Sequence, residues 1–62
     1  MRRGDYVSFK FIRKDFNDGG YVYSGTVLDT YVNGFKVEIN GQEINVMYAD
    51  VKVLDAYREV RL

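Results

Sequence analysis

The 62-residue chain contains no cysteine, no histidine and no proline. Without cysteine it cannot form a disulfide, and without both cysteine and histidine it lacks the ligands of the usual zinc sites. Ser8 and Ser24 have no histidine that could activate them as nucleophiles. We therefore expect no catalytic residues, no cofactor and no bound metal, and we predict that the chain is not an enzyme.

Long apolar runs are also missing. The longest runs from Val46 to Ala49, far short of the roughly 20 residues that a membrane-spanning helix needs. The basic start, Met1 to Arg3, is not followed by the apolar stretch of a signal peptide. We expect a soluble, cytoplasmic protein with no membrane partner.

The chain has no excess of one charge, since nine basic residues balance nine acidic ones. The charges are nevertheless segregated. Residues 1–14 hold five basic residues against one acidic residue, whereas residues 15–62 hold four against eight. A neutral chain lacks the broad basic footprint of a non-specific DNA-binding protein. Its N-terminal part could still form a local basic patch, with ordinary solvated charge as the alternative.

What the sequence does contain is a period-two alternation of apolar and polar residues between glycine-containing turns. This pattern predicts β-strands in a single domain, 1–62, with its core at about residues 4–54. The tail, 55–62, forms either a short helix capped by Asp55 or an edge strand from Glu59 to Leu62. The expected strands are Tyr6–Ile12, Tyr21–Val32, Phe35–Ile39, Gln42–Tyr48 and Val51–Leu54.

Two Asn-Gly pairs predict tight hairpin turns, because a type I′ turn needs a positive φ at both central residues. Taken as two-residue turns, Asn33-Gly34 and Asn40-Gly41 fix the register of three neighbouring strands. One face of these strands is then apolar throughout, which favours the assignment. That face carries Leu28, Val32, Phe35, Val37, Ile39, Ile44 and Val46.

The same register sets Asp29, Glu38 and Glu43 side by side on the opposite face. Like charges directly opposite one another destabilise a sheet. The acidic row therefore predicts a site for a cation or for a partner's lysine or arginine. The alternative is that a longer loop or a bulge breaks the row, or that Lys36 and Lys52 relieve its repulsion.

Basic and aromatic residues occur together from the first strand to the start of the second. Such a mixture can hold phosphates with its cations and stack bases on its rings. Alternatively, the tyrosines cover the ends of a small barrel and keep their hydroxyls in water. We call the predicted surface the basic-aromatic face, and its members are Lys10, Arg13, Lys14, Phe16, Tyr21 and Tyr23.

The stretches GDYVSFKF, YSGTVLDTY, GFKVEI and INVMYADVKVL resemble the small bacterial SH3-like domains related to KOW and Tudor modules. The resemblance covers roughly residues 4–54. It implies an all-β fold, a small five-stranded SH3-like barrel with a short C-terminal tail. It also implies a non-catalytic binding module that contacts nucleic acid or a protein associated with transcription or translation.

Two other functions remain open. The segregated charges and small size are compatible with a protein–protein interaction or self-assembly module, such as a small phage- or plasmid-type adaptor or inhibitor, which could be a homo-oligomer. The chain is also similar to the plasmid-encoded type II dihydrofolate reductases. Their active site is a pore between four subunits, and their pore strand reads V-Q-I-Y where this chain has Asn45 to Tyr48. That resemblance implies a tetramer that binds NADPH.

Overall fold

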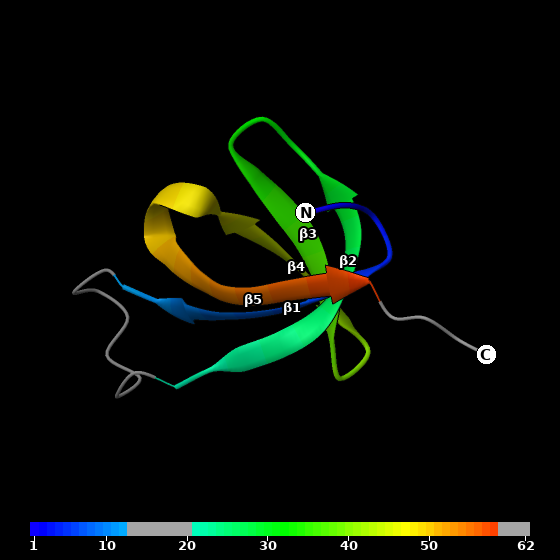
Figure 1. Cartoon of the computed structure of the whole chain (residues 1–62), viewed down its shortest axis with the longest axis horizontal. Helices are drawn as coiled ribbons and strands as arrows, with labels where there is room; N and C mark the ends of the chain where they lie inside the picture. Colours follow the sequence, from blue (N-terminus) through cyan, green and yellow to red (C-terminus); the bar gives the residue numbers. More distant parts are fainter. Residues whose placement is uncertain (13–20, 59–62) are drawn as a thin grey trace.

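The computed structural model describes residues 1–12 and 21–58, which form one sheet of five antiparallel strands (Figure 1). The prediction of an all-β fold with five strands is confirmed. The strand order is β4-β3-β2-β1-β5, and a short 3-10 helix, η1, connects β4 to β5. The elements are β1 Asp5–Phe11, β2 Tyr23–Thr30, β3 Gly34–Ile39, β4 Gln42–Met47, η1 Tyr48–Asp50 and β5 Val51–Arg58.

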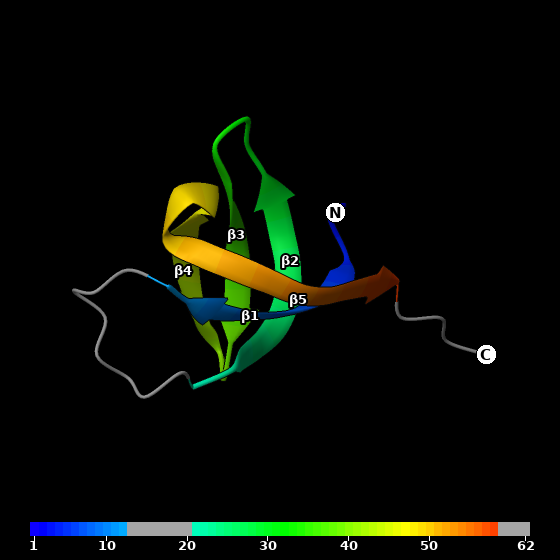
Figure 2. The same ribbon diagram turned by 60° about the vertical axis from the view of Figure 1, so that its left-hand side comes forward.

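The sheet is strongly bent, so that β1 and β5 cross over β2, β3 and β4 (Figure 2). The core lies between these two halves. Edge-to-face contact between the rings of Phe9 in β1 and Phe35 in β3, 5.6 Å apart at their centroids, joins one half to the other. The buried apolar side chains are Val7, Phe9, Val27, Phe35, Val37, Val46 and Val51.

The β3–β4 hairpin has the predicted register. Its turn residues, Asn40 and Gly41, have φ values of 52° and 82°, the left-handed region that a type I′ turn requires. Glu38 lies opposite Glu43, and Ile39 lies opposite Gln42. The Asn-Gly pair and the alternating residues on either side of it were sufficient to specify this hairpin.

The predicted turn at Asn33-Gly34 is wrong. Phe35 pairs with Thr30 and not with Val32, so the connection is longer than two residues. Gly34 has no positive φ and belongs to β3, where an added Cβ would collide with the carbonyl oxygen of Val46. Glycine is needed here for the close approach of β4, which is a different reason from the one a turn would give. Val32 is fully exposed in the loop and contributes nothing to the core.

A β-bulge in β2 changes which residues of that strand face the core. The register against β3 shifts between Val27 and Asp29, leaving Leu28 as the extra residue. Val27 thereby lies opposite Val37 and is buried, whereas Leu28, predicted to face the core, is half-buried. Bulges of this kind increase the local bend of a strand. β2 is the strand that joins β3 and β4 to the other half of the bent sheet, β1 and β5.

The last strand is longer than predicted. Residues 55–58 continue β5 and pair with the first half of β1, with Asp55 opposite Ser8 and Tyr57 opposite Tyr6. The helix alternative for Asp55 is therefore wrong, and the alternative edge strand, 59–62, lies outside the described residues. Within residues 1–12 and 21–58, no helix is long and apolar enough to cross a membrane.

Candidate binding surfaces

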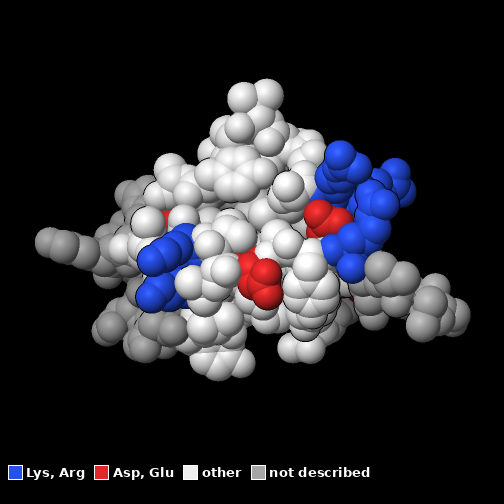
Figure 3. All heavy atoms as spheres, in the orientation of Figure 1, with Lys and Arg blue, Asp and Glu red and all other residues white. Residues whose placement is uncertain are grey.

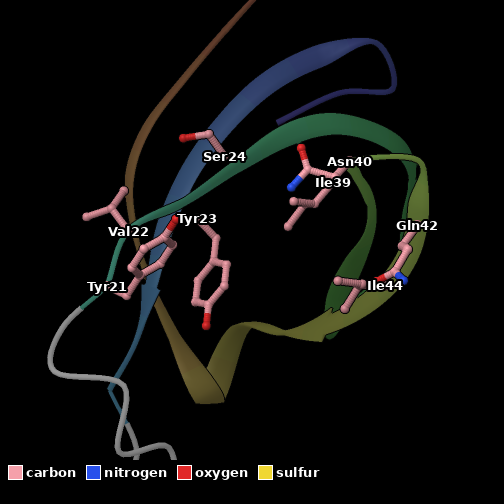
Figure 4. Close-up of a pocket in the computed structure, with 8 residues that line it drawn as sticks. All are labelled: Tyr21, Val22, Tyr23, Ser24, Ile39, Asn40, Gln42 and Ile44. Carbon is pink, nitrogen blue, oxygen red and sulfur yellow. The ribbon is translucent and has the colours of Figure 1, made fainter.

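A groove with a volume of about 650 Å³ lies between the first residues of β2 and the β3–β4 hairpin (Figure 4). Its size falls within the range of about 300–1,000 Å³ that is typical of ligand sites. We call it the tyrosine groove. It is lined by Tyr21, Val22, Tyr23, Ser24, Ile39, Asn40, Gln42 and Ile44.

Tyr21 and Tyr23 form the β2 side of the groove. The Tyr23 ring packs against the rings of Phe9 and Phe11, at centroid distances of 5.9 and 5.6 Å, and is thereby anchored to the core. The Tyr21 ring lies 4.8 Å from the Tyr23 ring but is 62% exposed. Tyr21 therefore presents an aromatic surface to solvent on a rigid support.

The hairpin side of the groove combines two apolar and two amide side chains. Ile39 and Ile44 come from β3 and β4, while Asn40 and Gln42 flank Gly41 at the turn. No charged side chain is among the lining residues. The tyrosine groove is thus suited to an uncharged, partly aromatic group that can also form hydrogen bonds with amides.

Lys10 does not lie on the same face as Tyr23, so the basic-aromatic face is not a single surface. Side chains alternate between the two faces of a strand, and Tyr23 pairs with Phe9, which points into the core. Lys10, the next residue along β1, points outward and lies directly opposite Lys52 of β5. The remaining predicted members, Arg13, Lys14 and Phe16, lie outside the described residues.

The pairing of β1 with β2 links the strand that carries Lys10 to the strand that begins the groove. Ser24 lines the groove, and its hydroxyl is hydrogen-bonded to the hydroxyl of Ser8 at 3.0 Å. Ser8 is two residues from Lys10 on the same face of β1, a separation of about 7 Å along a strand. An extended ligand could therefore contact the groove and the lysine pair together.

The outward side of β1 and β5 carries charges of both signs (Figure 3). Basic atoms form two separate groups on the face shown, with acidic atoms between them. Besides the lysine pair, the two strands bring Tyr6 and Tyr57 into ring contact at 5.7 Å on this side. Asp5 is buried, and its carboxylate accepts a hydrogen bond from the backbone N–H of Arg2. This surface is amphoteric overall and basic only locally.

The predicted acidic row is broken in the structure. The bulge in β2 places Asp29 opposite Lys36, so only Glu38 and Glu43 remain opposite one another. Lys36 Nζ lies 3.8 Å from Glu43 Oε1 and lessens the repulsion between the two glutamates. Both alternatives to an acidic site, a bulge and a nearby lysine, are therefore present. The described part of the chain contains no group of three or more acidic residues that could hold a metal ion.

Sequence reasoning identified Tyr21 and Tyr23 but missed the opposite wall of the groove. Asn40 was predicted only as a turn residue and Gln42 only as the first residue of a strand, because nothing local to the hairpin shows that it faces the start of β2. Lys52 was considered only as a possible neighbour of the acidic row, and its place opposite Lys10 follows from the pairing of β1 with β5. Lys52 already lay in the predicted fifth strand, so the missing information was which strand pairs with β1 and in which register.

Comparison with known proteins places this chain in no family. No family model matches it, and no curated protein or solved structure is similar to it at a significant level.

Proposed function

We propose that the chain is a non-catalytic, SH3-like module that binds single-stranded nucleic acid. Bases enter the tyrosine groove, and the phosphates beside them meet Lys10 and Lys52. The observation that carries the proposal is the tyrosine groove itself, an uncharged aromatic and amide-lined site, and a lysine pair lies on the outward face of the adjoining strands β1 and β5.

The groove has the chemistry that unpaired bases require. Proteins bind single strands by stacking bases on aromatic side chains while cations outside the stack hold the backbone. Tyr21 offers the exposed ring, and Asn40 and Gln42 offer side-chain amides across from it. A phosphate inside the groove would find no cation, so the backbone is expected to remain at the rim.

The lysine pair has the chemistry that phosphates require. Two like charges directly opposite one another destabilise a sheet, and neither Lys10 nor Lys52 has an ion-pair partner among the residues described. A phosphate between them would relieve that repulsion. The pair therefore gains more from an anion than two isolated surface lysines would.

The SH3-like part of the proposal is supported by the arrangement of the strands. They form one antiparallel sheet in the order β4-β3-β2-β1-β5, with a 3-10 turn before the last strand. Small barrels of this type present loops and strand ends as binding surfaces, although a fold alone does not determine what they bind. The proposal therefore depends on the groove and the lysine pair.

The test is an NMR titration of the ¹⁵N-labelled chain with a pool of mixed single-stranded DNA octamers, first at low salt and then at moderate salt. We expect amide shifts in residues 21–24 and 39–44 and at Lys10 and Lys52, and smaller shifts at higher salt. A spectrum that stays unchanged at low salt would reject the proposal.

Tyr21 provides the matched variants for this titration. Tyr21→Ala removes the exposed ring, and loss of stacking of one base costs about 1–3 kcal/mol, so affinity should fall about fivefold or more. Tyr21→Phe keeps the ring and should bind within about twofold of the original chain. Equal affinities for the alanine and phenylalanine variants would show that stacking on Tyr21 plays no part.

A protein-binding function is the second candidate, and the exposed edge of β4 favours it. β4 ends one side of the sheet, and all its residues except Val46 are exposed, including the apolar Ile44 and Met47. An open edge can accept a further strand from a partner. In the same NMR experiment, shifts confined to β4 on addition of cell extract, with no response to oligonucleotides, would favour this function.

The tetrameric reductase is the third candidate. The tyrosine groove is formed within one chain, so the proposed function requires no oligomer. We expect light scattering coupled to size exclusion to give a mass near 7.2 kDa and no oxidation of NADPH with dihydrofolate. A tetramer that oxidises NADPH would establish the reductase instead.

A further inference from the structure

We infer that Tyr6 and Tyr57 form a second base-stacking site, on the outward face of β1 and β5, for the same strand whose phosphates meet the lysine pair. This inference rests on the proposed function and adds a second contact surface to it. It follows from the side chains that the pairing of β1 with β5 places on one face of the sheet.

The outward face of β1 and β5 holds a tyrosine pair and the lysine pair together. Tyr6, Ser8 and Lys10 alternate along β1 with residues that are buried in the core, so they point outward. The pairing with β5 places Tyr57 opposite Tyr6 and Lys52 opposite Lys10. The two pairs are thus four residues apart along one strand, a separation of about 14 Å.

The tyrosine pair offers an aromatic surface on a supported ring. The rings of Tyr6 and Tyr57 are in contact, with centroids 5.7 Å apart and planes tilted by 48°. Tyr6 is half-buried, with Thr26 of β2 opposite it on the other side, whereas Tyr57 is 50% exposed. Small β-domains bind single strands over about 4 nucleotides or more, with bases stacked on such rings. A strand held at the lysine pair therefore has a ring available to a base farther along its length.

The row between the two pairs is polar and contains one acidic residue. Ser8 is flanked by Ser24 of β2, whose hydroxyl lies 3.0 Å from its own, and by Asp55 of β5. Serine hydroxyls can donate hydrogen bonds to phosphate oxygens, whereas a carboxylate repels phosphates. We therefore expect the strand to run over the two serines, and we expect Asp55 to weaken its binding.

The first test is the NMR titration with the octamer pool, read at a second set of residues. We expect amide shifts at Tyr6, at Ser8 and in residues 55–57, over the same range of oligonucleotide concentration as the shifts in the tyrosine groove. Shifts in the groove and at the lysine pair without any at Tyr6 or Tyr57 would overturn the inference and leave the proposed function intact. A spectrum without any shift would overturn both.

Variants of Tyr57 separate stacking from the fold. Tyr57→Leu removes the ring but keeps an apolar side chain, and the affinity for the octamers, measured by fluorescence anisotropy, should fall about fivefold or more. Tyr57→Phe keeps the ring and should bind within about twofold of the original chain. Equal affinities for the two variants, each shown by its NMR spectrum to be folded, would contradict stacking on Tyr57.

Asp55→Asn decides the question even where Tyr57→Leu does not fold, because it keeps the size of the side chain. Loss of the carboxylate should tighten octamer binding about twofold or more at low salt, since nearby phosphates are no longer repelled. Asp29→Asn is the matched control. It removes the same charge from β2 beyond Thr26, the last residue of that strand in register with β1, and should change the affinity less. An equal effect of the two variants would mean that only net charge matters, and would overturn the inference.

Discussion

Two apolar side chains near the β2–β3 loop have opposite environments although the sequence pattern treats them alike. Phe35 is completely buried against Phe9 and Tyr48, whereas Val32 is fully exposed. Their difference comes from Gly34, which lies in β3 and not in the turn, so that Val32 falls in the loop. An Asn-Gly pair has two structural uses, a turn and a close approach, and only the packing of β4 decides between them.

These two residues give a stability prediction at the scale of single side chains. Phe35→Ala should cost about 3–5 kcal/mol through lost burial and a cavity, as much as a domain of this size is expected to have in total. Val32→Ala should change stability by less than about 0.5 kcal/mol. Urea denaturation followed by circular dichroism checks both. Similar losses in the two variants would mean that Val32 is packed after all.

Prediction from the sequence found one side of the tyrosine groove and missed the other. Tyr21 and Tyr23 were predictable as binding candidates because aromatic residues near basic ones are informative by themselves. Asn40 and Gln42 were not, because their functional position depends on a contact between two segments that the sequence separates by more than a dozen residues. Local chemistry can be predicted from a sequence, but the surface opposite it cannot.

At the scale of elements, β5 differs most from its predicted form. Its second half, 55–58, has no strict alternation of buried and exposed residues and is exposed throughout, so hydrophobic periodicity gave no signal. Residues 55–58 are recognised as a strand by their pairing with β1 and by the contact between Tyr6 and Tyr57. By contrast, the β3–β4 hairpin was predictable because its turn and its alternation agree.

A double-mutant cycle on Tyr6 and Tyr57 tests whether this half of β5 is held by that contact. We expect a coupling free energy of about 0.5–1.5 kcal/mol between Tyr6→Ala and Tyr57→Ala, as for other aromatic pairs. Tyr21→Ala, whose ring contacts Tyr23, serves as the control and should be additive with Tyr57→Ala. Additivity of both pairs would show that residues 55–58 do not depend on the tyrosine contact.

At the scale of the whole molecule, a balanced net charge limits how strongly the chain can hold a nucleic acid. The structure pairs Lys10 with Lys52, and basic and acidic atoms occur together on the face shown in Figure 3. The segregation of charge along the sequence predicted a basic N-terminal region. Among the described residues, Lys10 lies opposite Lys52 near one end of β1, and Asp5 lies opposite Arg58 at the other end.

The dependence of binding on salt follows from this arrangement. Two phosphate contacts give a slope of about −1.4 for log affinity against log salt with a single strand, so affinity should fall about sevenfold between 50 and 200 mM salt. Lys10→Gln should halve the slope, whereas Lys36→Gln, on β3 beside Glu43, should leave it unchanged. Anisotropy titrations at several salt concentrations measure the slope for the original chain and for each of the two variants. A slope unaffected by Lys10→Gln would remove that lysine from the interface.

The pairing of β1 with β5 has a consequence for the way the protein is made. Of the five described strands, β1 is synthesised first and pairs with β5, which is synthesised last, so this sheet cannot be completed until Val51 to Arg58 have been made. Contacts between such distant segments also slow folding. Until then the nascent chain carries an uncovered edge on β1, the kind of edge that pairs with other chains. The interval before Val51 to Arg58 have been synthesised is therefore the one in which the β1 edge of the sheet stays open.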